Sequence, residues 1–103
     1  MKDYSTARFW AITGIGYGKG FTPEEAVANY LRVQARNFNI TEAEVEAASW
    51  GRVWEAPEGA TGFVLDNAVH WTDAEDNTLD AEGTIVGDVG NMPEWAKHDE
   101  GGE

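Results

Sequence analysis

The chain has 103 residues, enough for one compact domain, and its five Trp, three Tyr and four Phe supply bulky apolar area for a core. It contains no cysteine, which excludes disulfide frameworks, thiolate metal sites and a cysteine nucleophile. Its net charge of −12 opposes direct binding to nucleic-acid phosphates.

The first predicted element is a single strand over residues 8–16, where aromatic and β-branched residues are frequent. The main helix follows, from residue 22 to about residue 37, with Thr22 as its N-cap and Glu25 completing a capping box. Residues 41–49 are compatible with a short helix or a strand. The pair Thr41 and Glu44 repeats the capping-box pattern and favours the helix.

Two further strands are expected over residues 50–56 and 62–71, joined by the glycine-bearing loop PEGAT. Their predicted register sets Trp54 opposite Val64 and Arg52 opposite Asp66, a pairing of opposite charges. If this pairing holds, the two strands form the centre of the sheet.

Residues 84–89 are expected to add a short edge strand, and residues 91–103 to form an acidic, glycine-rich flexible tail after a compact domain of residues 1–90. The predicted fold class is α+β. It has a small antiparallel sheet of three to four strands, in strand–helix–strand–strand order, with one main helix packed on one face.

The glycine-rich stretch GIGYGKG, residues 14–20, stands directly before the main helix and invites comparison with phosphate-binding loops. A Walker A loop needs Ser or Thr after Gly-Lys, but Gly20 follows Lys19. A dinucleotide fingerprint needs a third glycine where Lys19 stands. Glu24 and Glu25 already occupy the positive end of the helix. The stretch is therefore interpreted as a strand-to-helix turn.

The segment GKGFTPEEAVANYL resembles the helix opening of HicB-type antitoxins, and the strand–helix–strand–strand order resembles dodecins, which are small flavin-binding oligomers. HicB-type antitoxins have a hairpin before this helix, whereas only one strand is expected here. Dodecins lack an acidic loop and tail. Neither resemblance assigns the chain to a family.

No catalytic or metal-binding arrangement is recognisable in the sequence. The acidic loop over residues 72–83 fails the EF-hand pattern, because Thr78 stands where the turn glycine is required. Of the two histidines, His98 lies in the tail, and His70 could pair only with Asp73 past the strand end, although a solvated His70 is favoured. We therefore expect a protein that is not an enzyme, without catalytic residues, a metal or a cofactor.

The face of the predicted sheet opposite the helix is rich in tryptophan and forms the predicted binding surface. Its residues are Trp10, Trp50, Arg52, Trp54, Asp66 and His70. Exposed apolar patches mark interfaces, and Trp and Arg dominate binding hot spots, so we expect self-association through this face as a dimer or higher oligomer. Two alternatives stay open. In the first, residues 41–49 or 84–95 of the same chain cover the face. In the second, the face binds a foreign partner or a planar ligand.

The charge is divided unevenly, with +2 over residues 1–40 and −14 over residues 41–103. A second predicted surface collects the acids of the loop, Asp73, Glu75, Asp76 and Asp80. The expected function is that of a small acidic interaction protein that presents this surface to a basic protein partner. The alternative is a small-ligand-binding homo-oligomer that stacks a planar molecule on Trp50 or Trp54.

In style the chain is similar to small proteins of actinobacterial phages. That likeness implies a host-directed inhibitor or a nucleic-acid mimic acting in the host cytoplasm. No apolar run approaches the roughly 18 residues of a membrane span, and the start MKDYSTARFW lacks the apolar stretch of a signal peptide. A cytoplasmic location is therefore expected, with neither membrane nor nucleic acid as a direct partner.

Overall fold

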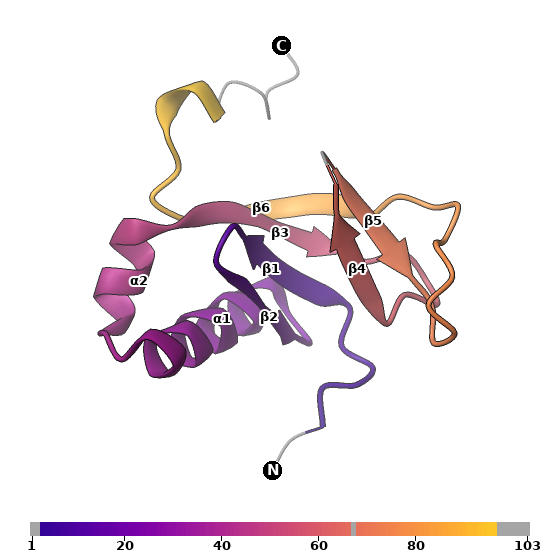
Figure 1. Cartoon of the computed structure of the whole chain (residues 1–103), viewed down its shortest axis with the longest axis horizontal. Helices are drawn as coiled ribbons and strands as arrows, with labels where there is room; N and C mark the ends of the chain where they lie inside the picture. Colours follow the sequence, from indigo (N-terminus) through magenta and orange to yellow (C-terminus); the bar gives the residue numbers. More distant parts are fainter. Residues whose placement is uncertain (1–2, 67, 97–103) are drawn as a thin grey trace.

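The computed structural model describes residues 3–66 and 68–96 of the chain (Figure 1). Its elements, in chain order, are β1 (Phe9–Thr13), β2 (Gly16–Gly20), α1 (Pro23–Phe38), α2 (Glu42–Ala48), β3 (Trp50–Glu55), β4 (Gly62–Leu65), β5 (Val69–Thr72) and β6 (Thr84–Gly90). The main sheet has the strand order β2–β1–β3–β6 and is antiparallel throughout, and β4 and β5 form a separate two-stranded sheet. With α1 packed on one face of a four-stranded antiparallel sheet, the predicted α+β class is confirmed.

The chain differs from the expected order before α1, where a hairpin takes the place of the single strand predicted over residues 8–16. The chain turns at Gly14 and Ile15, where the Ile15 N–H donates to Thr13 Oγ1 at 3.2 Å, and returns as β2. Glycines weaken strand propensity, so the second strand was interpreted as a turn. A hairpin before this helix is the feature of HicB-type antitoxins that the sequence was expected to lack.

The alternate glycines of β2 let α1 lie directly against the strand. A Cβ at Gly18 would clash with the backbone of Tyr30, and one at Gly20 would clash with the backbone of Ala26. Gly14, in contrast, has open space around it. The interpretation of residues 14–20 as a turn is therefore correct only for the first residues, and the rest form a flat packing surface for α1.

Both helices begin where their capping residues predict. On α1, Thr22 Oγ1 accepts from the Glu25 N–H at 3.0 Å, while the Glu25 carboxylate accepts from the Phe21 N–H at 2.7 Å rather than from Thr22. On α2, Thr41 and Glu44 form a complete capping box, so the helix favoured over residues 41–49 is confirmed as Glu42–Ala48.

The predicted pairing of residues 50–56 with residues 62–71 is wrong. Strand β3 pairs with β1 on one side and with β6 on the other, which leaves neither edge for β4. Residues 62–72 instead fold back on themselves as the β4–β5 hairpin, with Val64 opposite His70 and Phe63 opposite Trp71. The expected edge strand over 84–89 is confirmed as β6, at the outer edge of the sheet.

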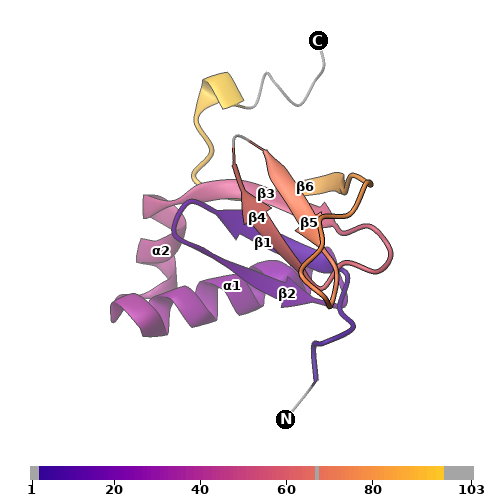
Figure 2. The same ribbon diagram turned by 45° about the vertical axis from the view of Figure 1, so that its right-hand side comes forward.

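The two faces of the main sheet carry residues of different size. The face toward α1 carries small residues such as Ala11, Gly18 and Val53, which pack against the buried Tyr30 of α1. The opposite face carries the tryptophans and holds a second apolar cluster beneath β4–β5. The molecule thus has three layers, with the helices, the main sheet and the hairpin in turn (Figure 2).

A buried chain of hydroxyl groups ties the helices to the sheet. The Tyr30 hydroxyl lies 2.7 Å from both Thr13 Oγ1 and Ser49 Oγ, and Ser49 Oγ donates to the Val45 carbonyl at 2.8 Å. Ser49 is thus bonded within the core, at the junction between α2 and β3.

Residues 91–96, the start of the predicted tail, lie against the main sheet beyond β6. Met92 and Ala96 are buried, and the Asn91 N–H donates to the Ser49 carbonyl at 2.8 Å. Residues 97–103 of the predicted tail lie outside the described residues.

Candidate binding groove on the tryptophan face

Cross-strand rows place the predicted binding residues of β1 and β3 on one face. Trp10 lies opposite Trp54, and Ile12 lies opposite Arg52. This face is turned away from α1, because the alternate residues Ala11 and Val53 belong to the core beneath that helix. The sequence therefore placed these side chains on the correct face, although it paired β3 with the wrong strand.

The expectation that Trp10 lies at the surface is wrong, since its side chain is only 2% exposed. The β4–β5 hairpin covers it, and Phe63 and Trp71 meet the Trp10 ring edge-on with centroids 5.6 and 5.7 Å away. Covering within one chain was an open alternative, with residues 41–49 or 84–95 as the expected segments, and of these, residues 92–95 cover another part of the face. The hairpin performs this role over one part of the face, because residues 62–72 are not used in the main sheet.

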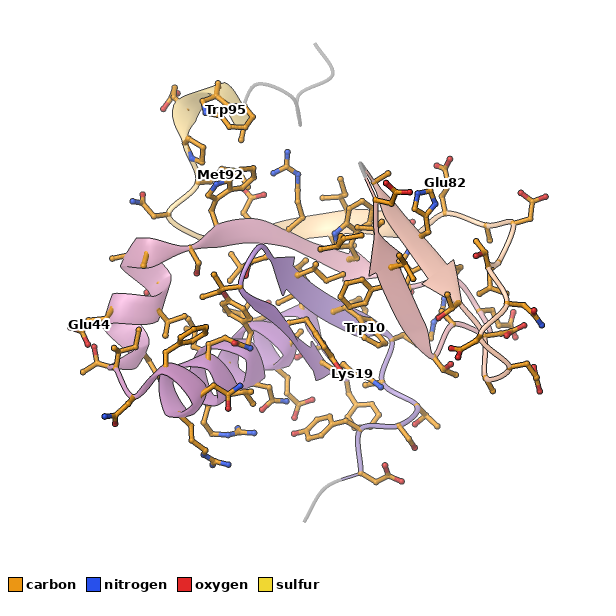
Figure 3. All side chains as sticks on the ribbon, in the orientation of Figure 1. Trp10, Lys19, Glu44, Glu82, Met92 and Trp95 are labelled. Atoms are coloured by element: carbon orange, nitrogen blue, oxygen red, sulfur yellow. The ribbon has the colours of Figure 1, made fainter. Side chains whose placement is uncertain are left out.

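Packing rather than hydrogen bonding holds this aromatic cluster together. Within residues 3–66 and 68–96, the buried indole N–H groups of Trp10 and Trp71 have no hydrogen-bond partner. Lys19 lies with its ammonium 4.6 Å from the Trp10 ring centroid, and partial burial lowers the pKa of Lys19. Figure 3 shows Lys19 beside Trp10 at the lower edge of the sheet.

The opposite part of the face is covered by residues 92–96. Arg52 donates to Met92 Sδ at 3.4 Å and to the Ala96 carbonyl at 3.3 Å. Trp95 meets Trp50 edge-on with centroids 5.5 Å apart, and it remains 64% exposed. Met92 and Trp95 stand above β3 in Figure 3, away from the hairpin.

Between these two covers a groove of about 500 Å³ remains open on the sheet face. Trp50, Arg52 and Trp54 line it from β3, and Leu65 and Val69 line it from the hairpin. The rim is apolar, with Leu65 53% exposed. Three of the predicted binding residues are thus brought together in one cavity, whereas Trp10 lies beneath the hairpin.

Arg52 stacks on one tryptophan of the groove. Its guanidinium carbon lies 5.8 Å from the Trp50 ring centroid, and the Asp88 position of β6 lies directly opposite it across the sheet. Trp54 instead turns toward Trp71, with ring centroids 6.3 Å apart. A bound planar group would therefore meet Trp50, Arg52 and Trp54 in a row rather than stack between two parallel indoles.

The hairpin residues of this groove were not predicted, because residues 62–71 were interpreted as one strand. The turn-favouring Asp and Asn in LDNA, residues 65–68, were the available signal for a hairpin. The turn also brings the His70 ring to 3.2 Å from the Asp66 backbone oxygen. A continuous strand would have kept these two residues roughly 13 Å apart.

A second hollow, of about 400 Å³, lies on the far side of β5. Its lining includes Trp54 and Val69, which also line the groove, together with His70 and the acidic residues Asp80 and Glu82. Trp54 thus stands between an apolar groove and an acidic hollow. Glu82 was not among the predicted surface acids, because the sequence did not show that its loop returns beside β3.

The predicted acidic surface is only partly a free surface. Asp73 Oδ1 accepts from the backbone N–H groups of Glu75 and Asn77 at 3.0 and 2.9 Å, so it organises the loop. Asp76 occupies the left-handed region with φ of 67°, and Glu75, Asp76 and Asp80 are exposed. Acidic residues outside this set lie elsewhere on the molecule. In Figure 3 Glu44 lies at one end of the molecule, and Glu82 lies toward the other.

Among the residues that the structure describes, no group of three or more His, Asp or Glu side chains is placed to hold a metal ion. None of the helices in that part of the chain is long and apolar enough to cross a membrane. Comparison with protein-family models, with curated proteins and with solved structures gave no match.

Proposed function

We propose that this protein is a non-enzymatic binding protein that presents an acidic surface to a basic protein partner. The observation that carries the proposal is the position of Trp54 between the groove and the hollow that contains Asp80 and Glu82. An arginine of the partner would find an aromatic ring and two carboxylates in the same hollow. Apolar side chains beside that arginine would enter the groove between Leu65 and Trp50.

The charge of the surrounding chain supports a basic partner. From Asp73 to Ala96 the sequence contains seven acidic residues and neither lysine nor arginine. A surface of this kind attracts a positively charged protein and accelerates its association at low ionic strength. A host-directed inhibitor and a nucleic-acid mimic are both specific forms of this function.

The test uses a fluorescein-labelled oligo-arginine peptide and two variants with the same change in net charge. D80N/E82Q removes both carboxylates from the hollow, and E42Q/E46Q removes two exposed carboxylates from α2. We expect D80N/E82Q to weaken binding by about tenfold and E42Q/E46Q by less than about twofold, with affinity falling steeply as salt is added. Equal effects of the two variants would show that only overall charge matters, and the proposal would fail.

Self-association through the tryptophan face remains the second part of this proposal. The area left for it is the groove and its rim, including Ile15, Leu65 and Trp95, all of which are exposed. Light scattering during gel filtration tests it directly, since a defined dimer or higher oligomer is expected. A monomer at all concentrations would refute self-association, and the role of this surface would then be the binding of a foreign partner.

A second candidate function is the binding of a planar small molecule, possible because Trp50, Arg52 and Trp54 line one cavity. The volume of about 500 Å³ is typical of ligand pockets. Absorbance spectra of the purified protein beyond the indole band would detect a co-purified ligand. Trp50→Ala should then release it, whereas D80N/E82Q should retain it with little dependence on salt.

A further inference from the structure

The two edges of the main sheet are treated differently by the fold. At the β2 edge, side chains of α1 bond to the strand. Asn29 Nδ2 donates to the Lys19 carbonyl at 2.7 Å, and Gln34 Nε2 donates to the Tyr17 carbonyl at 3.2 Å. Strand β2 is therefore closed to a further strand by the helix beside it.

The β6 edge has no comparable cover. Within residues 3–66 and 68–96, no side chain hydrogen bonds to the backbone of Thr84–Gly90, and β3 pairs with only one of its sides. Ile85 and Val86 are 44% and 40% exposed. The strand contains neither proline nor lysine, the residues that commonly protect an edge.

A shallow groove runs along this edge on the helix side of the sheet. It has a volume of about 200 Å³, and its lining includes the apolar residues Val27 and Val86 and the acidic residue Glu24. Asp88 pairs with Arg52 and therefore points to the opposite, tryptophan face of the sheet. An added strand would place alternate side chains in this groove, because successive residues of a strand point to opposite faces. Its apolar side chains would meet Val27 and Val86 in this groove, and its basic side chains, on the opposite face of the sheet, would meet Asp88.

We propose that β6 is a docking edge that takes up an extended basic segment of a protein partner as an additional strand. The backbone groups of β6 supply the hydrogen bonds, and Asp88 on the tryptophan face selects positive charge. This inference rests on the proposed function in one respect, namely that the partner is basic. The surface itself is different from the groove at Trp54.

A second copy of the chain is the less favourable occupant. Each copy carries a net charge of −12. Strand β6 lies within the segment from Asp73 to Ala96, which contains no lysine or arginine. Pairing of two β6 edges would bring these acidic segments together. A basic segment gains from the same charges that oppose self-pairing.

The bulge in the pairing of β3 with β6 limits the length of the added segment. Val53 pairs with Gly87 and Trp54 with Ile85, so Val86 is the extra residue. Bulges twist an edge and interrupt a long ladder, which is one way in which proteins prevent sheet-to-sheet aggregation. We therefore expect a short extended segment rather than a whole sheet edge.

The experiment titrates the uniformly ¹⁵N-labelled protein with a short synthetic peptide of alternating lysine and valine. The control peptide has the same sequence with alternate backbone nitrogens methylated, which keeps the charge and removes the N–H donors. The largest amide shifts are expected in β6, over residues 84–90, and the methylated peptide should bind about tenfold more weakly. Equal binding of the two peptides, or shifts centred on Trp50 and Trp54, would overturn the proposal.

Two charge-reversal variants provide a matched pair. Asp88→Lys places a lysine on the docking edge, and Glu46→Lys makes the same change in charge on the exposed surface of α2. Asp88→Lys should weaken binding of the lysine–valine peptide by about tenfold and Glu46→Lys by less than about twofold, with circular dichroism confirming that both fold. Equal losses, or a dimer of the unmodified protein formed through β6, would overturn the proposal.

The outcomes also separate this inference from the proposed function. In one outcome, D80N/E82Q weakens binding of the oligo-arginine peptide while the methylated and unmethylated peptides bind equally. That result would support the acidic hollow and refute the docking edge. If the methylated peptide alone loses binding while D80N/E82Q has no effect, the docking edge stands and the hollow is refuted.

Discussion

Glycine has a packing role in β2 that its usual association with turns conceals. Gly16, Gly18 and Gly20 alternate along the strand and face α1. The helix backbone comes close to Gly18 and Gly20, where any side chain would intervene, and Gly16 lies against the Gln34 side chain. Gly14 lies in the connection between β1 and β2 and touches nothing on the Cβ side. Glycines within one short motif therefore have different roles, since those of β2 are required for packing against α1 and Gly14 is not.

The difference predicts the effect of two alanine substitutions. Gly18→Ala should destabilise the protein by about 1–3 kcal/mol, because the new methyl group clashes with the Tyr30 backbone and α1 must shift. Gly14→Ala should change stability by less than about 0.5 kcal/mol. Urea unfolding followed by tryptophan fluorescence measures both. A tolerated Gly18→Ala would contradict the close approach of α1 to β2.

At the scale of elements, the β4–β5 hairpin acts as a lid over half of the tryptophan face. Phe63 contacts Trp10, Tyr17 and Trp71 edge-on, and its neighbour Val64 points to the other side of the hairpin, where it is exposed. The hairpin is not bonded into the main sheet as a strand. The attachment of the hairpin therefore depends on these aromatic contacts, and the partners Trp10 and Tyr17 are distant from the hairpin in the sequence.

This dependence is tested by Phe63→Ala and Val64→Ala. Phe63→Ala should cost about 3 kcal/mol, shift tryptophan emission to longer wavelength and increase the binding of a hydrophobic dye, because the hairpin loosens over Trp10. Val64→Ala should remain within about 0.5 kcal/mol of the parent protein. If Phe63→Ala leaves the emission unchanged, the hairpin is not what shields Trp10.

At the scale of the whole molecule, the charge opposes the compact state. The net charge is −12, and the exposed acids of α2, of the loop over residues 73–82 and of β6 extend over a molecule 42 Å in its longest dimension. Repulsion among them is screened by salt, since the Debye length falls to about 10 Å at 0.1 M. A basic partner would relieve the same repulsion, so charge links stability and binding.

Sodium chloride should therefore stabilise the protein. Raising its concentration from low to physiological ionic strength should increase Tm by about 4 °C, corresponding to about 1 kcal/mol for a chain of this size. Scanning calorimetry measures the shift, and D80N/E82Q, which starts with less charge, should show a smaller one. A Tm that falls with salt would mean that favourable ion pairs outweigh repulsion.

Much of the fold could be predicted from local patterns. The starts of α1 and α2 depend on side chains within one helical turn, such as Thr22 with Glu25 and Thr41 with Glu44, so a short window of sequence contains the information. The edge strand β6 and the placement of Trp10, Arg52 and Trp54 on one face also followed from composition and period-two alternation. The acidic loop could be predicted from composition in the same way.

The candidate site was only partly predictable. Its tryptophans were identified, but Leu65, Val69 and Glu82 join them only because the hairpin and the following loop fold over the sheet. Asn29 of α1, a polar residue of a type usually found at the surface, is buried and donates to the Lys19 carbonyl of β2. Helical periodicity cannot show that a polar side chain will meet the free edge of a strand.

The sequence by itself determined the α+β class, the helix boundaries, the charge asymmetry and which tryptophans share a face. Only the tertiary structure decided that β3 pairs with β1 and β6, and that the hairpin buries Trp10 and leaves a groove beside it. The physical reason is the range of the interactions. Caps and alternation act between near neighbours, whereas strand partners and covering elements are chosen by contacts between residues distant along the chain, where several pairings satisfy the same local pattern.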